Sequence, residues 1–430
     1  MSRFLAYTLS IPGHLFPQMS TLAELRRRGH DAVVVTSAPA LESIERAGVR
    51  ARAATPELER GLNLPRAENP EERRRRRRAL VNQQGKLAAA DLERAIEAER
   101  PDVLLLDPLW GAMIAAEGSG LPWALAAHSP VLIPTLAPRA SGPGYPPPGG
   151  VLGRLRDRLV GARQRRRLDA RLPRVNTLRA VRGLEPLAHV WEGPLRAPLV
   201  LAYTAEPFEY PRSDWPASVR FVGPGSWDAP AEPLEWLADA DGPPLVLVAT
   251  SSVRQNDEVL AETALAALAD QPFRVVATMP LEGLTGHIPS NARVERYVPH
   301  AAVLERAVCV VCHGGLGITQ KALAAGVPVV AVPFGRDQFE VARRVEAAGA
   351  GVRLPNDRLT PARLREGVRR AMACRAGAKR VAAAFRAAGG APAAADALEA
   401  LAGGGGSRRG TPSRAGRPEP RLGVRDGARP

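Results

Sequence analysis

Two histidines stand where an apolar strand would end and a helix begin. His313 opens the run H-G-G-L-G-I-T after the apolar segment Val308–Cys312. A glycine-rich turn before a helix leaves backbone N–H groups and the positive helix end directed at one point, which suits a phosphate. Neither the Walker spacing nor the dinucleotide G-x-G-x-x-G fingerprint fits. The segment therefore predicts a diphosphate site made by His313, Gly314, Gly315 and Thr319, although the glycines alone leave open a turn without a ligand.

The second histidine, His14, follows the strand candidate Arg3–Leu9 in the turn I-P-G-H-L-F-P. An imidazole with an ordinary pKa near ~6.5 can take a proton at physiological pH. Asp107 ends the strand Val103–Leu106, so its carboxylate should emerge at the same sheet edge and orient the imidazole. The pair predicts general-base chemistry. A capping histidine and a turn aspartate are the structural alternatives.

These residues need a parallel sheet to bring them together, and the sequence predicts two. Apolar, β-branched strands alternate with helical patterns from the start of the chain, and a new series begins at Pro244. We expect an α/β protein with two Rossmann-like doubly wound domains that face each other across a cleft. The expected boundaries are residues 1–222, a Pro- and Gly-rich linker 223–243, residues 244–402, and a disordered basic tail 403–430.

Composition narrows the class of protein. No stretch of this 430-residue chain is as long and apolar as a membrane span, and the N-terminus lacks a signal-like pattern, so a cytoplasmic protein without an integral membrane segment is expected. The net charge is +15, with arginine-dense stretches at 73–78 and 154–182. Aromatic residues are absent from the first of these, which disfavours nucleic acid as a partner and favours solvated helix faces or loops.

The three cysteines do not form a metal site or a disulfide framework. Cys309 and Cys312 make a C-x-x-C pair with no second pair, and Cys374 stands alone. Their spacing in a strand places Cys309 and Cys312 on opposite faces. We expect buried thiols and no bound metal.

Four motifs occur in order along the chain: G-H-x-x-P at 13–17, Y-V-P-H at 297–300, H-G-G-L-G-I-T from 313 and P-F-G-R-D-Q at 333–338. Their order and spacing resemble the GT-B glycosyltransferases of the UDP-glycosyltransferase superfamily. Within it the chain is most similar to the bacterial natural-product branch, the macrolide and enediyne transferases, and in particular to the calicheamicin-type members. The resemblance covers about residues 1–390, and its C-terminal motifs are the more specific ones.

The resemblance implies an inverting, metal-independent transfer of a sugar from a nucleotide diphosphate to an acceptor hydroxyl, without a cofactor. His14 would be the general base and Asp107 its orienting carboxylate. The expected partners are a nucleotide sugar and a hydrophobic small-molecule acceptor such as an antibiotic, with a homodimer as the candidate assembly. The residues expected to bind the donor are Ser252, Tyr297, Val298, His313, Gly314, Gly315, Thr319, Asp337 and Gln338.

Two departures from the family pattern bear on the nucleotide. Ile318 stands where many relatives have Ser or Thr, so a phosphate hydroxyl is missing. Lys321 stands where UDP-dependent relatives often have a glutamate that bonds both ribose hydroxyls, which lysine cannot accept. We therefore expect dTDP rather than UDP, unless Lys321 simply points to solvent. A non-catalytic helper of a transferase and a nucleotide-sugar epimerase remain the alternative functions.

Overall fold

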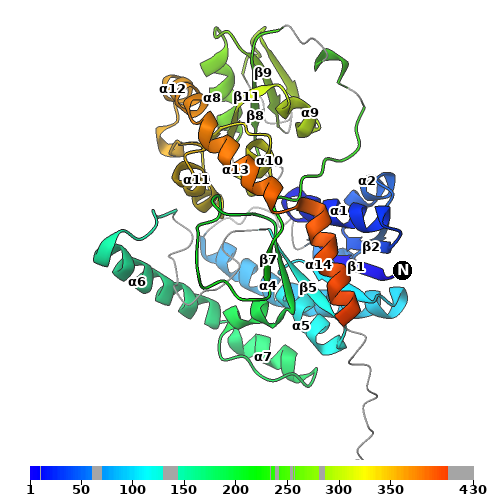
Figure 1. Ribbon diagram of the computed structural model, residues 1–430. Coiled ribbons are helices and arrows are strands. Elements are labelled where there is room, and N and C mark those ends of the chain that lie inside the picture. Colours follow the sequence, from blue (N-terminus) through cyan, green and yellow to red (C-terminus); the bar gives the residue numbers. More distant parts are fainter. Residues whose placement is uncertain are drawn as a thin grey trace, which may run out of the picture.

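The computed structural model describes residues 1–9, 11–60, 70–128, 144–232, 234–237, 242–251, 255, 257–279 and 286–404, with 59–60 and 70–82 described by their backbone only. Two parallel sheets, each covered by helices, form its two halves (Figure 1). The strand order is β3-β2-β1-β4-β5-β6-β7 in the first sheet and β10-β9-β8-β11-β12-β13 in the second. The expected α/β class with two doubly wound parallel sheets is confirmed.

The strands of the first sheet are β1 Arg3–Tyr7, β2 Asp31–Thr36, β3 Arg50–Ala53, β4 Val103–Leu106, β5 Trp123–Ala127, β6 Leu199–Ala202 and β7 Val219–Phe221. Those of the second are β8 Leu245–Ala249, β9 Arg274–Thr278, β10 Ala292–Glu295, β11 Ala307–Cys312, β12 Val329–Ala331 and β13 Gly351–Arg353. The central strands β2, β4, β5 and β8 are buried along their whole length, because helices cover both faces of a parallel sheet.

The helices of the first half are α1 Pro12–Arg27, α2 Leu41–Arg46, α3 Pro56–Arg60, α4 Pro70–Glu99, α5 Trp110–Ser119, α6 Gly150–Asp169 and α7 Leu172–Ala180. The later ones are α8 Glu258–Leu268, α9 His300–Leu304, α10 Leu316–Ala324, α11 Gln338–Ala347, α12 Pro361–Ala373, α13 Arg375–Ala387 and α14 Gly390–Gly404. Short 3-10 turns lie at Ala38–Ala40, Val190–Arg196, Glu235–Leu237 and Asn356–Arg358. Among these described helices, none has the length and apolarity that a membrane span requires.

The last helix does not stay with the second sheet. After α13 the chain turns at Gly389 and Gly390, both at positive φ, and α14 crosses to lie beside α1 (Figure 1). Ala394, Ala395 and Leu398 are buried in the core of the first half. The expected second domain, 244–402, is therefore wrong at its end, because its final helix packs on the first sheet and extends to Gly404.

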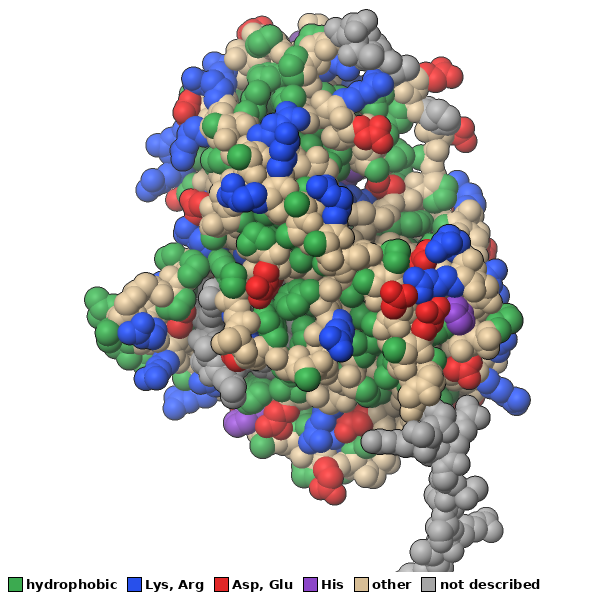
Figure 2. Space-filling model, viewed as in Figure 1, with side chains coloured by type: hydrophobic (Ala, Val, Ile, Leu, Met, Phe, Trp, Pro, Cys, Tyr) green, Lys and Arg blue, Asp and Glu red, His purple; other side chains and the backbone are tan. Residues whose placement is uncertain are grey.

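The arginine-dense stretches are helical, and blue basic side chains are spread over the visible face of both halves (Figure 2). Residues 73–78 lie in α4. Arg179 is not solvated as expected: it is 1% exposed and forms a bidentate pair with Glu117 at 2.6 and 2.9 Å. The predicted loop at 137–150 is irregular over residues 144–149, and α6 begins at its last residue. Residues 137–143, and the predicted tail beyond residue 404, lie outside the described part of the chain.

Candidate active site

His14 lies in the first turn of α1, not in a loop before it as the sequence suggested. Ile11 is the N-cap residue and Pro12 takes the first helical position, where a missing N–H costs nothing. Most of the turn I-P-G-H-L-F-P that the sequence predicts is therefore helical, and Pro17 lies inside α1. The early start of α1 fixes the backbone of His14 at the carboxyl end of β1.

The structure brings His14 and Asp107 together, with Nδ1 of the imidazole 3.0 Å from Oδ2 of the carboxylate. Asp107 is fully buried and also accepts hydrogen bonds from the Thr8 hydroxyl and the Leu9 N–H, both at 2.9 Å. Gln18 donates to its other oxygen at 2.8 Å. This carboxylate is held in one orientation by groups from two segments of the chain, the residues after β1 and helix α1.

The pair stabilises charge on both partners. Burial opposes the charged form of Asp107, but His14, His128 and the Leu9 N–H together hold the pKa of Asp107 below its ordinary value. Burial likewise opposes the imidazolium, yet the Asp107 carboxylate raises the pKa of His14 above its ordinary value. Because Nδ1 faces Asp107, the His14 proton acceptor is Nε2. This arrangement suits a general base.

His128 completes the cluster, and the sequence reasoning missed it. It follows β5 at the same sheet edge, its ring centroid is 4.0 Å from that of His14, and its Nδ1 lies 3.6 Å from Oδ1 of Asp107. Nδ1 donates to the Ala126 carbonyl at 3.1 Å. Burial and then the His14 charge lower the pKa of His128 to about 4, so it stays neutral when His14 is charged. The position of His128 directly after an apolar strand is the sequence feature from which its place in this cluster could have been predicted.

His14, Asp107 and His128 have ligand atoms within 4.8 Å of one another, a spacing that a metal ion could use. Their hydrogen bonds fit that use poorly. Nδ1 of His14 faces Asp107, Nδ1 of His128 donates to a carbonyl, and Asp107 already accepts from several donors. A cation would have to displace these bonds. The donor set fits a base with its orienting partners better than a metal centre.

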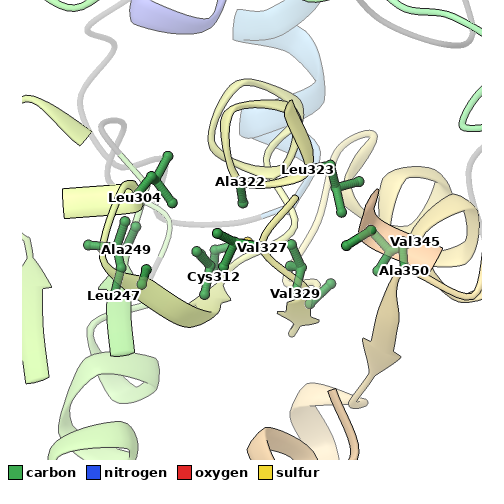
Figure 3. Packing of buried hydrophobic residues seen from close by; sticks show 14 of the residues in the cluster. Leu247, Ala249, Leu304, Cys312, Ala322, Leu323, Val327, Val329, Val345 and Ala350 are labelled. Carbon is green, nitrogen blue, oxygen red and sulfur yellow. The ribbon is translucent and has the colours of Figure 1, made fainter. Parts of the chain in front are cut away.

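The second half places the strand β11, a glycine turn and α10 as the sequence predicted. Buried residues of β8, β11, β12 and α10 pack in one cluster, which holds α10 against the second sheet (Figure 3). Gly314 has φ of +77°, and Gly315 is the N-cap residue. A Cβ at Gly315 would lie 2.2 Å from Nε2 of His313, so a larger residue there would have to displace the imidazole, whereas no protein atom lies within 4 Å of a Cβ at Gly317.

His313 is buried in the turn, where its Nδ1 lies 3.4 Å from the Ala249 carbonyl, and burial lowers its pKa. Thr319 departs from expectation. It is fully buried, and its hydroxyl contacts Sγ of Cys312 at 3.7 Å, on the strand beneath the helix. The predicted role of Thr319 at the helix mouth is wrong for this conformation. Cys309 and Cys312 are buried thiols in opposite core clusters, as expected.

Asp337 and Gln338 stand at the start of α11. The charge of the Asp337 carboxylate acts on two histidines from opposite halves: after Asp107 it adds to the raised pKa of His14, and it opposes the burial that lowers the pKa of His313. Gln338 is 3% exposed, accepts from the Phe334 and Gly335 N–H groups and donates to a glutamine side chain at 2.8 Å. It shapes the turn before α11, a role the sequence did not indicate.

Lys321 does not point to solvent. Its Nζ donates to the Trp227 carbonyl at 2.7 Å, pairs with the Asp228 carboxylate and lies 5.1 Å from the Phe16 ring centroid. Burial lowers its pKa, although Asp228 opposes that shift. The lysine thus joins the second half to the interdomain segment and to α1.

Tyr297 and Val298, which are expected to bind the donor, lie near this junction. Tyr297 is 44% exposed, and its hydroxyl donates to the Ala229 carbonyl at 3.1 Å. Val298 is buried, so only its backbone could face a ligand. Ser252 lies outside the described residues, and the structure does not place it.

Buried contacts join the halves around the site. Arg344 of α11 is 5% exposed and bonds the buried carboxylate of Glu209 at 2.8 Å. Glu340 accepts from the Gly144 N–H at 3.0 Å, and Gln320 donates to the Tyr203 carbonyl at 2.8 Å. These contacts hold the His14 cluster opposite the β11–α10 turn.

Comparisons with known proteins agree with this geometry. Residues 262–401 match the family model of the erythromycin biosynthesis protein CIII-like C-terminal domain. The chain is 34% identical over 396 residues to 4'-demethylrebeccamycin synthase of Lentzea aerocolonigenes, covering 86% of this chain and 91% of that one. It is also 37% identical over 159 residues to a PGL/p-HBAD biosynthesis glycosyltransferase of Mycobacterium tuberculosis strain H37Ra, which covers 36% of each chain.

Solved structures share the fold. The calicheamicin glycosyltransferase CalG4 superposes with a TM-score of 0.73 at 23% identity, covering 96% of this chain and 100% of that one. The glycosyltransferase VinC, solved with dTDP, gives a TM-score of 0.69 at 23% identity and covers 93% and 99%. At this identity the superposition speaks for the architecture alone.

Proposed function

Since the chain belongs to the GT-B natural-product glycosyltransferases and transfers a sugar to an acceptor, we propose that it works by inversion, from a dTDP-activated deoxysugar. The proposed acceptor is a hydroxyl of a hydrophobic natural product of polyketide or enediyne type. The observation that carries the inverting mechanism is the 3.0 Å contact between His14 and the fully buried Asp107.

In the proposed step, Nε2 of His14 removes the proton from the acceptor hydroxyl, and that oxygen attacks the anomeric carbon from the face opposite the diphosphate. The bond from carbon to the diphosphate oxygen breaks as the new glycosidic bond forms, so the configuration inverts. Asp107 stabilises the imidazolium that results. Neutral His128 packs beside it without adding a like charge.

The leaving diphosphate gains negative charge in this step. We assign its stabilisation to the backbone N–H groups at Gly315 and Gly317 and to the positive end of the nine-residue helix α10, because Gly315 is the N-cap residue of that helix. We propose that these groups carry that charge without a metal ion. Asp337, near both histidines, is the group we assign to the sugar hydroxyls.

The preference for dTDP rests on Lys321. An ammonium group offers no acceptor to a ribose hydroxyl, and Nζ is already bonded to Asp228 and the Trp227 carbonyl. A 2'-deoxyribose needs one acceptor fewer at this place. The dTDP in the VinC structure supports the same choice for a protein of this fold.

A thermal-shift series with dTDP, UDP, GDP and CDP tests the donor, because a ligand that binds only the folded state raises the unfolding midpoint. We expect the largest rise with dTDP. Stabilisation by UDP and not by dTDP would refute the Lys321 argument.

The catalytic assignment is tested separately with His14→Ala, which should keep dTDP binding and lose acceptor glycosylation. Unchanged transfer by this variant would refute the base assignment and revive the non-catalytic helper. A product without a new glycosidic bond would instead favour an epimerase.

A further inference from the structure

Helix α6 presents an exposed apolar surface that has no part in the mechanism proposed above. Val151, Leu152, Leu155 and Leu159 are 72, 81, 51 and 64% exposed. Single exposed leucines are common on protein surfaces, but four within three helical turns form a patch. Figure 1 shows α6 extending away from the body of the first half, and Figure 2 shows hydrophobic side chains gathered at its projecting end.

The four side chains form a row because of their spacing. Val151, Leu155 and Leu159 are four residues apart, so they lie above one another on one side of the helix, with Leu152 next to them. The attached side of α6 is different: its buried residues are Asp157 and Gly161. The helix therefore attaches to the body through small and polar residues and turns its apolar row outward, which is the reverse of an ordinary surface helix.

Arginines flank this row on both sides. Arg154 and Arg158 lie along one edge and Arg163 along the other, and all three are exposed. The helix carries seven arginines and two aspartates. The two carboxylates are taken up in ion pairs, Asp157 with Arg156 and Asp169 with a histidine. The exposed face is thus apolar along its centre and positive along its edges.

The charge pattern on α6 indicates which kind of partner can bind to this face. A second copy of the same helix would bring arginine rows against arginine rows, which repel. An anionic bilayer meets both features, since its headgroups pair with arginine and its acyl region accepts leucine. Tyr145, 38% exposed just before the helix with Arg156 4.8 Å from its ring centroid, adds an aromatic group of the kind that sits at membrane interfaces.

We propose that α6 docks this protein on an anionic membrane surface, with its apolar row among the lipids and its arginines on the headgroups. The contact is peripheral and leaves the fold unchanged.

Co-sedimentation of the full chain with vesicles tests this. Vesicles of phosphatidylcholine alone are compared with vesicles that contain roughly a quarter phosphatidylglycerol, at about 0.1 M salt. The wild type should sediment with the anionic vesicles. Leu152→Ser/Leu155→Ser should weaken that partition about tenfold or more, and Arg154→Glu/Arg158→Glu should weaken it at least about fivefold per arginine.

The matched control is Val181→Ser/Val259→Ser, which removes apolar side chains that are 78 and 47% exposed outside α6. It should sediment as the wild type does. The arginine-rich sequence after residue 404 is present in every variant, so its attraction to anionic lipid is common to all. An unchanged unfolding midpoint and unchanged stabilisation by dTDP establish that each variant folds.

Equal sedimentation of the wild type and the leucine variant would overturn the proposal. So would a wild-type dimer without lipid that the leucine variant converts to a monomer, because the row would then be a protein interface. A raised acceptor KM in the leucine variant with unchanged vesicle binding would also overturn it, since the row would then hold the acceptor.

Discussion

Replacing Asp107 by Asn separates the charge of the carboxylate from its role in orienting His14. Three donors, the Thr8 hydroxyl, the Leu9 N–H and Nδ1 of His14, share one oxygen of Asp107. The amide oxygen of Asn would take that place. Its NH2 would then face Gln18, whose buried Oε1 has no hydrogen-bond partner among the described residues and can turn to accept. The His14 tautomer should survive the exchange.

What the variant loses is the charge. Two unit charges about 4 Å apart at an effective dielectric constant of ~20 interact by ~4 kcal/mol, and the amide dipole returns part of this. We expect kcat/KM to fall about 10²- to 10³-fold. Because burial still disfavours the imidazolium, the pKa of His14 should fall, and the acid limb of the pH profile should move to lower pH.

The assay is the pH dependence of kcat/KM for acceptor glycosylation, with stabilisation by dTDP as the control for folding and donor binding. A loss of less than tenfold would show that the carboxylate charge contributes little to the base. A loss beyond about 10⁴-fold would show that the amide imposes the wrong His14 tautomer, and would refute the argument from Gln18.

Three further predictions follow from buried contacts. His128→Ala should admit water beside Asp107, lower kcat about tenfold or more and move the acid limb of the pH profile to lower pH. His128→Phe should keep most of the wild-type pH profile, because the phenyl ring still excludes water. Equal behaviour of the two variants would contradict the role of His128 in packing against His14. Gly315→Ala should weaken dTDP binding about tenfold or more in calorimetry, because its Cβ would lie 2.2 Å from the neighbouring imidazole; an affinity equal to that of the wild type would contradict a role for this close approach. Arg344→Leu leaves two buried carboxylates without their cation and should cost roughly 3–5 kcal/mol in chemical denaturation; a loss under about 1 kcal/mol would mean that water reaches this pair.

The two catalytic candidates could be predicted from the sequence because neighbouring parallel strands end at a common edge of the sheet. His14 and Asp107 each follow a fully apolar strand, and β1 and β4 are direct neighbours, so their meeting follows from local pattern and one pairing. The β11–α10 turn could be predicted equally well, since the strand, the glycines and the helix are contiguous in the chain. Even the close approach of Gly315 to the His313 side chain involves residues only two positions apart in the chain.

Other features depend on pairings that no local pattern contains. His128 joins the cluster because β5 pairs with β4, and Lys321 meets Asp228 across 93 residues of sequence. The return of α14 to the first sheet, which buries Ala394 and Leu398 there, has the same origin. Local periodicity indicates only that such a helix has an apolar side.

The sequence by itself therefore determined the parallel α/β class, the two strand-end histidines and the glycine turn before α10, because strand, turn and helix preferences act over neighbouring residues. Only the tertiary structure decided which side chains face the cleft. It turned Thr319 into the core, bound Gln338 to its own turn and placed His128 against His14. The physical reason is that a side chain's direction and partners are set by packing between elements far apart in the chain, where burial and hydrogen bonding select one arrangement among many that the local pattern allows.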